Sequence, residues 1–126
     1  MKPLDRLVHE HQIVLLVLEA AERDLTQLRH TGQVDTARLR RVVDFLTHFV
    51  DRCHHSKEEQ FLFARMRERG VPGESGPIAV LLREHQQGRR HVKALGLGLN
   101  KAARNKVALT NAVRKHLPTY LELMRT

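Results

Sequence analysis

The sequence predicts an all-α protein, an antiparallel up-down-up-down four-helix bundle. Apolar residues recur every three or four positions through four long segments, and no segment shows the sustained two-residue alternation of a half-buried strand. Short turn signals separate the segments, which places consecutive helices side by side and antiparallel. With four Phe, one Tyr and no Trp, the core must be built from Leu, Val and Ala, a composition that suits helices better than sheets.

The chain has 126 residues, and we expect a single domain over residues 1–126. No run approaches the ~18 apolar residues of a membrane span, and the start, MKPLDRLVHEHQ, is too polar for a signal peptide. The single Cys cannot form an internal disulfide. These features predict a soluble, cytoplasmic protein with no membrane partner. The sequence offers no nucleophile–base pair and no phosphate loop, which favours a protein that is not an enzyme.

The first helix is expected to end at the turn signal Thr31-Gly32. At about 100° per residue, His11 falls at the centre of its apolar stripe and His9 falls on the opposite side. The other members of the stripe are Leu4, Leu7, Val8, Val14, Leu18 and Leu25.

The second helix is expected to begin after Asp35, which can act as its N-cap. Phase places Cys53 and Phe61 on the core side, so Cys53 is expected to be a small apolar core residue rather than a ligand or redox thiol. The other members of this stripe are Leu39, Val42, Val43, Leu46, Phe49 and Val50.

The same helix continues through the dense polar stretch HHSKEE, residues 54–59. His54 and Glu58 are four residues apart, so one helical face directs both into the bundle. His55 lies on the flank of that face, with Glu58 between the two imidazoles in phase. Glu59 is expected to face outward.

The third helix is expected after the turn GVPGESGP, residues 70–77, and the fourth from about Lys101. His85 falls at the centre of the third apolar stripe. Three helices therefore each send a histidine toward one core. A single His in an apolar stripe is usually a hydrogen-bonded core residue, but three buried without partners would be costly. A metal ion would satisfy several neutral imidazoles at once, and mixed imidazole and carboxylate ligands suit iron, manganese or zinc.

These residues resemble the hemerythrin-like HHE cation-binding domain. HEHQIV, DRCHHSKEEQFLF and GPIAVLLREHQQGRRHV follow the order of the family's signatures, and the similarity runs from about residue 4 to 95 and more weakly to the end. The resemblance implies a bundle that holds a non-haem di-iron centre. It implies oxygen binding or sensing, a response to nitric oxide or redox state, or iron handling, with a small diatomic ligand or another small oxidant as partner. The metal ligands that it implies are His11, His54, His55, Glu58 and His85.

The chain departs from the family pattern in two places. Oxygen carriers have a second His four residues after the third-helix ligand, where this chain has Arg89, a permanent cation that cannot be a ligand. Arg89 either places a donor near a bound anion or bridging carboxylate, or reaches into solvent. The family's fourth helix ends in a His followed four or five residues later by Glu or Asp, and residues 120–126, YLELMRT, resemble the lead-in to that His.

On this alignment the fourth helix is truncated, and the site holds one metal and a second only weakly. A rival alignment takes His116 as the last His, with Tyr120, which cannot bridge metals, in place of the acid. A shortened helix would expose apolar surface and favour a homo-oligomer.

The net charge of +8 is concentrated at residues 85–126, which hold nine Lys and Arg and one acidic residue, Glu122. The alternative function is therefore a metal-free helical interaction module that binds an acidic partner, nucleic acid or protein, through this basic half. The simpler explanation of the charge is a solvated surface, because no aromatic residues interleave with the basic ones.

Overall fold

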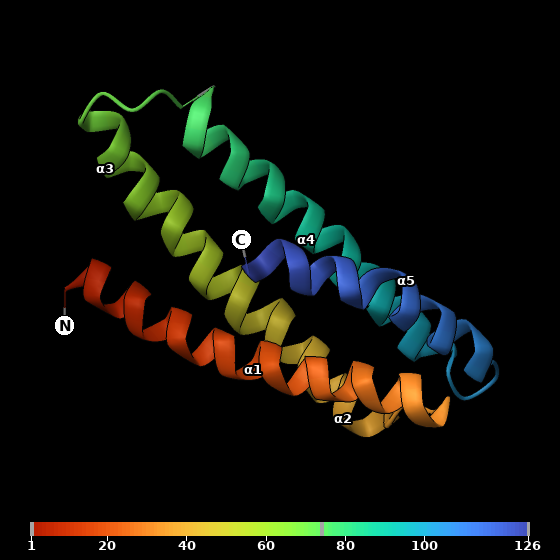
Figure 1. The fold of residues 1–126 in the computed structure, drawn as a ribbon. Helices are drawn as coiled ribbons and strands as arrows, with labels where there is room; N and C mark the ends of the chain where they lie inside the picture. The colour runs from red at the N-terminus through yellow and green to blue at the C-terminus, as the bar shows by residue number, and fades with distance from the viewer. Residues whose placement is uncertain (1, 74, 126) are drawn as a thin grey trace.

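The computed structural model describes residues 2–73 and 75–125, and within them the chain forms helices and no strand. The helices make the predicted antiparallel bundle of four rods (Figure 1). The second rod is a composite in which two π-helical segments interrupt the α-helix. The elements are α1 (Pro3–Thr31), α2 (Thr36–Phe45), η1 (Leu46–His55), η2 (Glu58–Leu62), α3 (Phe63–Glu68), α4 (Gly76–Lys101) and α5 (Lys106–Arg125).

The first connection follows its local signals. Gly32 ends α1 with a φ of 73°, a left-handed conformation that glycine adopts without strain. Its N–H donates to the carbonyl of Leu28 at 2.8 Å. Asp35 then caps α2, as predicted, by accepting a hydrogen bond from the backbone N–H of Arg38 at 3.1 Å. The predicted turn at residues 70–77 joins α3 to α4, and Glu74 within it lies outside the described residues.

The main core lies between the four rods, at the end of the bundle near the α1–α2 and α4–α5 connections. It draws on residues 14–28, 39–50, 95–102 and 109–121. Its fully buried side chains include Leu18, Leu28, Leu39, Leu46, Leu95 and Leu117. None of the helices in the described residues is long and apolar enough to cross a membrane.

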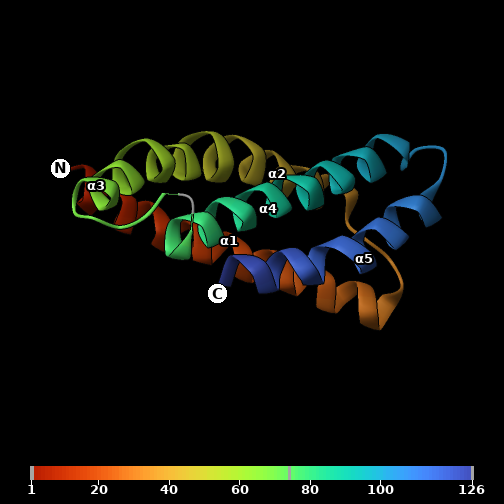
Figure 2. The ribbon, with the colours of Figure 1, turned by 90° about the horizontal axis from the view of Figure 1, so that it is seen from above.

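The fourth rod is shorter than the others. Figures 1 and 2 show that α5 ends about halfway along the bundle, so α1, α3 and the first part of α4 form a three-helix end. Apolar side chains are exposed there: Leu4 is 47%, Val8 63% and Phe61 49% exposed. The prediction that Phe61 points toward the core is therefore wrong.

The π-helical segments explain why the directions of side chains in the second rod differ from those predicted at 100° per residue. In a π-helix each N–H bonds to the carbonyl five residues earlier, as the N–H of Ser56 does to Asp51. The wider turn rotates the chain by less than 100° per residue, so the inward direction shifts along the sequence. Cys53, predicted to lie in the core, is exposed. His54 and His55 are both buried instead.

Candidate metal centre

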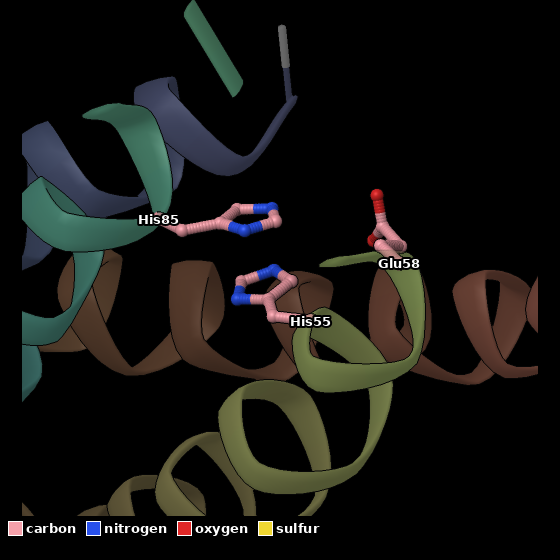
Figure 3. A group of neighbouring side chains, drawn as sticks. All are labelled: His55, Glu58 and His85. Carbon is pink, nitrogen blue, oxygen red and sulfur yellow. The ribbon is translucent and has the colours of Figure 1, made fainter. Parts of the chain in front are cut away.

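Two imidazoles from different rods lie face to face at the middle of the bundle. His55 comes from η1 and His85 from α4; their ring centroids are 3.9 Å apart and their planes 11° from parallel (Figure 3). His85 occupies the buried stripe of α4, seven residues after Ile78 and ten before Leu95, as predicted. His55 reaches the same level because the π-helical turn directs it inward. Each ring is buried by the other and by the surrounding helices.

Glu58 completes a group of three ligand-type side chains. One nitrogen of His55, one nitrogen of His85 and one carboxylate oxygen of Glu58 all lie within 4.8 Å of one another. Figure 3 shows a nitrogen of each ring on the side where Glu58 lies. Metal–ligand bonds of about 2.0–2.2 Å place the ligand atoms of one ion about 3–4 Å apart, so small side-chain movements would close the group around an ion. Two imidazoles and a carboxylate suit iron, manganese or zinc.

Burial fixes the protonation state of one of these ligands. Burial, and then repulsion from His85, lowers the pKa of His55 to about 3. His55 is therefore neutral near pH 7, which is the form in which an imidazole binds a metal ion.

His54 is buried beside this group but directs both ring nitrogens to carboxylates. Its Nε2 lies 2.9 Å from Oε1 of Glu58, and its Nδ1 lies 3.3 Å from Oε2 of Glu10. Burial acts against the charged imidazole, but the two carboxylates together raise the pKa of His54. Burial also acts to raise the pKa of Glu58, yet the hydrogen bond from His54 lowers it. His54 therefore holds the Glu58 carboxylate in its ionised form.

Glu10 is a site residue that the sequence interpretation missed. It is 6% exposed, contacts His54, and forms an ion pair with Lys57. The signal was present in the sequence, since Glu10 lies three residues after Leu7 and four before Val14, which is the spacing of the buried stripe of α1.

His11, the next residue, is exposed, so the prediction that it lies at the centre of that stripe is wrong by one position. Its ring centroid lies 5.9 Å from that of His54, which places it at the edge of the site. The group of three ligand atoms does not include His11 or His54.

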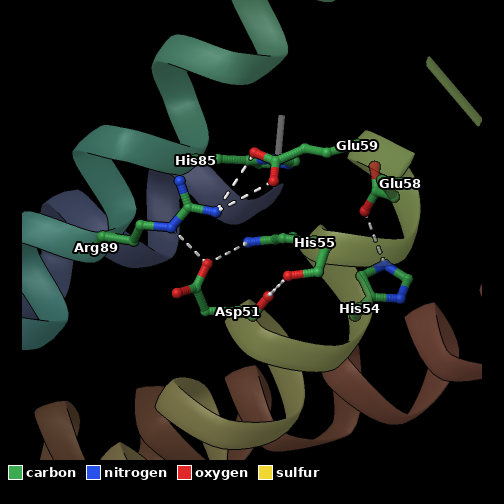
Figure 4. Close-up of polar contacts among 8 residues, drawn as sticks. Asp51, His54, His55, Glu58, Glu59, His85 and Arg89 are labelled. Atoms are coloured by element: carbon green, nitrogen blue, oxygen red, sulfur yellow. Dashed lines mark hydrogen bonds and ion pairs between the residues drawn. The ribbon is translucent and has the colours of Figure 1, made fainter. Parts of the chain in front are cut away.

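The other edge of each ring faces a second pair of carboxylates (Figure 4). Nδ1 of His85 lies 3.4 Å from Oε1 of Glu59, and Nδ1 of His55 lies 3.8 Å from Oδ1 of Asp51. Glu59 was expected to face outward, and that prediction is wrong, because the π-helical turn brings it alongside α4. The contact between His85 and Glu59 is within hydrogen-bond distance, so Nε2 is the nitrogen of His85 that remains for a metal. The longer distance between His55 and Asp51 is a contact without a hydrogen bond.

Arg89 joins these two carboxylates. Its Nε donates to Oδ1 of Asp51 at 2.6 Å, and its Nη2 donates to the two oxygens of Glu59 at 3.4 and 3.5 Å. Burial acts to lower the pKa of Arg89, but the two carboxylates raise it overall. Of the two roles considered from the sequence, the structure therefore favours a donor held against carboxylates.

His116 lies elsewhere in the bundle. Its Nδ1 is 3.0 Å from Nδ1 of His91 in α4, and Tyr120, one turn later, is buried in the core. The rival alignment that takes His116 as the last ligand therefore gains no support from the geometry of the described residues.

A comparison with models of protein families identifies the family of this chain. The model of the hemerythrin HHE cation-binding domain matches residues 2–125. The chain belongs to this family. The resemblance inferred from the sequence is thus confirmed over nearly the whole chain, and cation binding agrees with the group formed by His55, Glu58 and His85. Comparisons with curated proteins and with solved structures each gave no match.

Two cavities flank the histidine pair of this HHE domain. The smaller, about 100 Å³, lies on the Glu58 side and has polar lining residues together with apolar ones from α1, α4 and α5. The larger, about 410 Å³, lies between the second rod and α4, on the side of Asp51 and Arg89. Both are lined by His55 and His85, so each edge of the imidazole pair faces its own cavity.

Proposed function

We propose that this HHE domain binds a metal ion through His55, Glu58 and His85, with iron as the first choice and manganese or zinc as ions that suit the same ligands. The convergence of one nitrogen from each of two buried imidazoles and one carboxylate oxygen within 4.8 Å supports the proposal most directly. The family supports a cation as the occupant.

The surrounding side chains have defined tasks in this proposal. His54 orients the Glu58 carboxylate through its 2.9 Å contact. Glu59, within hydrogen-bond distance of Nδ1 of His85, orients that ring and leaves its Nε2 for the ion. Asp51 lies 3.8 Å from Nδ1 of His55, beyond hydrogen-bond distance, and contributes charge beside that ring. When bound, iron would supply redox and Lewis-acid chemistry, and the protein would supply position and charge.

The small cavity beside Glu58 supports a role in sensing or iron handling. Three protein ligands leave coordination positions open, and about 100 Å³ is room for water or a diatomic molecule. We propose that oxygen, nitric oxide or another small oxidant reaches the ion through this cavity. His11 and His54 line it as well, so they are the proposed source of any further protein ligand.

Metal binding by the stripped protein tests the proposal. Chelator-treated protein is titrated anaerobically with Fe²⁺, and bound metal is counted by mass spectrometry while thermal unfolding is followed. We expect one ion per chain and, at a free concentration 100 times Kd, stabilisation by about 2.7 kcal/mol.

Matched variants locate the ion. His85→Ala and Glu58→Ala are expected to lose most of the binding, because each removes one of three ligands. His9→Ala and His48→Ala remove exposed histidines from the first and second rods and are expected to bind as the wild type does. Absence of binding by the wild type, or equal binding by His85→Ala and His48→Ala, would contradict the proposal.

A further inference from the structure

The solvent-facing side of α4 carries a straight row of cations. At about 100° per residue, these exposed side chains fall within about 80° of one another and span about 27 Å of helix. They form the basic row: Arg83, Arg90, Lys93 and Lys101. Because α5 packs alongside α4 (Figures 1 and 2), exposed Lys115 widens the row near its middle. Its neighbour His116 has Nδ1 3.0 Å from Nδ1 of His91 in α4.

Acidic side chains do not neutralise the basic row. Residues 85–121 contain no Asp or Glu. Glu84 is half-buried and lines the small cavity at the metal centre instead. In the described part of the chain no member of the row forms an ion pair, although other arginines do. Lys93 shares the larger cavity with Asp44 without pairing with it. The positive potential of the row is therefore directed into solvent, where it attracts anions.

We propose that the basic row, together with Lys115, binds the phosphate backbone of duplex DNA. A duplex presents regularly spaced negative charges along a stiff rod, with about 3.4 Å per base pair. A row of about 27 Å therefore faces about eight base pairs. Gln86 and Gln87 are exposed beside Arg83 and add amide donors, which also bind phosphate oxygens in protein–DNA contacts. These side chains lie outside the proposed metal centre, so the inference does not depend on the proposed function.

The composition of this face favours duplex DNA over other anionic partners. Single strands are bound largely by stacking of bases on aromatic side chains, and Tyr120, the aromatic residue of α5, is buried in the core. A helix that binds a membrane surface presents an apolar face to the lipid. The apolar face of α4 packs into the core instead, and within the row Leu97 is the exposed large apolar side chain.

Binding to a fluorescently labelled duplex of about 20 base pairs, followed by anisotropy, tests the inference on the protein as purified. Five phosphate contacts predict a slope of about −4.5 in log K against log salt, a loss of about 500-fold in affinity between 50 and 200 mM NaCl. Two duplexes of unrelated sequence are expected to bind equally, because phosphate contacts carry no sequence information. A single strand of the same length is expected to bind more weakly.

Matched double variants locate the surface. Arg90→Gln with Lys101→Gln removes two cations of the row, and is expected to bind at least tenfold more weakly at 100 mM NaCl, with a slope shallower by about 2. Arg90→Lys with Lys101→Arg keeps both charges and is expected to bind as the wild type does. Arg6→Gln with Arg52→Gln removes the same charge from exposed positions of α1 and the second rod. This control is expected to stay within about twofold of the wild type.

Three results would overturn the inference. The first is a wild type that does not bind the duplex at 50 mM NaCl. The second is equal weakening by the Arg90/Lys101 and Arg6/Arg52 glutamine variants, with helix content unchanged by circular dichroism, because net charge rather than this face would then bind. The third is sedimentation with phosphatidylserine vesicles without binding to the duplex, which would make a membrane the partner. A wild type that binds the duplex but no metal ion would support this inference and contradict the proposed function.

Discussion

The contact between Glu10 and His54 gives the most specific prediction for stability. Glu10→Ala removes the acceptor of a ring nitrogen that is almost fully buried, since His54 is 3% exposed. Leaving a buried donor without its partner costs about 1–3 kcal/mol. The other partner, Lys57, has a side chain that is 31% exposed and regains water, so it adds little. We therefore expect a loss of about 1–3 kcal/mol in the free energy of unfolding.

Urea unfolding of metal-free protein, followed by circular dichroism near pH 7, measures this loss. Glu10→Gln keeps an acceptor oxygen in the same place and is expected to lose less than Glu10→Ala. Glu19→Ala truncates an exposed glutamate on the same helix and is the matched control, expected within about 0.5 kcal/mol of the wild type. If Glu10→Ala and Glu19→Ala were equally stable, the role assigned to Glu10 would be wrong.

Three further predictions concern the metal-free protein. The pKa of His55, about 3, lies below the ordinary 6.5 of the unfolded state, so the unfolded state takes up the proton first as the pH falls. The free energy of unfolding therefore decreases below pH 6.5, by about 2 kcal/mol at pH 5. His55→Gln should remove this part of the pH dependence when stability is measured by urea unfolding. Gly98→Ala places a Cβ 3.0 Å from that of Ala112, and this crowding costs about 1–3 kcal/mol, of which the helix propensity of Ala returns about 1 kcal/mol. A net loss of up to about 2 kcal/mol is expected in thermal melts; a Gly98→Ala chain more stable than the wild type would contradict the close packing of α4 on α5. The thiol of Cys53 is exposed and is expected to react with a thiol reagent in the native protein about as fast as in urea. Slow reaction in the native protein would instead indicate that Cys53 is buried in the core.

The fold could be predicted from the sequence because its signals are local and repeated. The three-to-four-residue spacing of Leu and Val persists through each rod, and Gly32 and Asp35 mark the ends of the helices that they cap. His85 could be placed on the buried stripe because α4 is a regular α-helix at that point. Where the helix is regular, phase alone gives the direction of a side chain.

The details of the site could not be predicted, because they depend on a change of helix type and on contacts between rods. The π-helical turns move Cys53 out of the core and turn His55 from the flank, where it was expected, to a buried position, and nothing in the residue spacing signals them. Glu59 gains its role only because α4 brings Arg89 and His85 alongside it. In α1 the error was of one position: His11 was placed at the centre of the buried stripe, which Glu10 occupies in the structure.

Diffraction from crystals loaded with Mn²⁺ or Fe²⁺, measured at the absorption edge of the metal, tests the central claim most directly. The anomalous map is predicted to show a peak within coordination distance of Nε2 of His55, Nε2 of His85 and a carboxylate oxygen of Glu58. A loaded crystal with no peak at these three residues, or with its peak at another histidine pair such as His91 and His116, would contradict it.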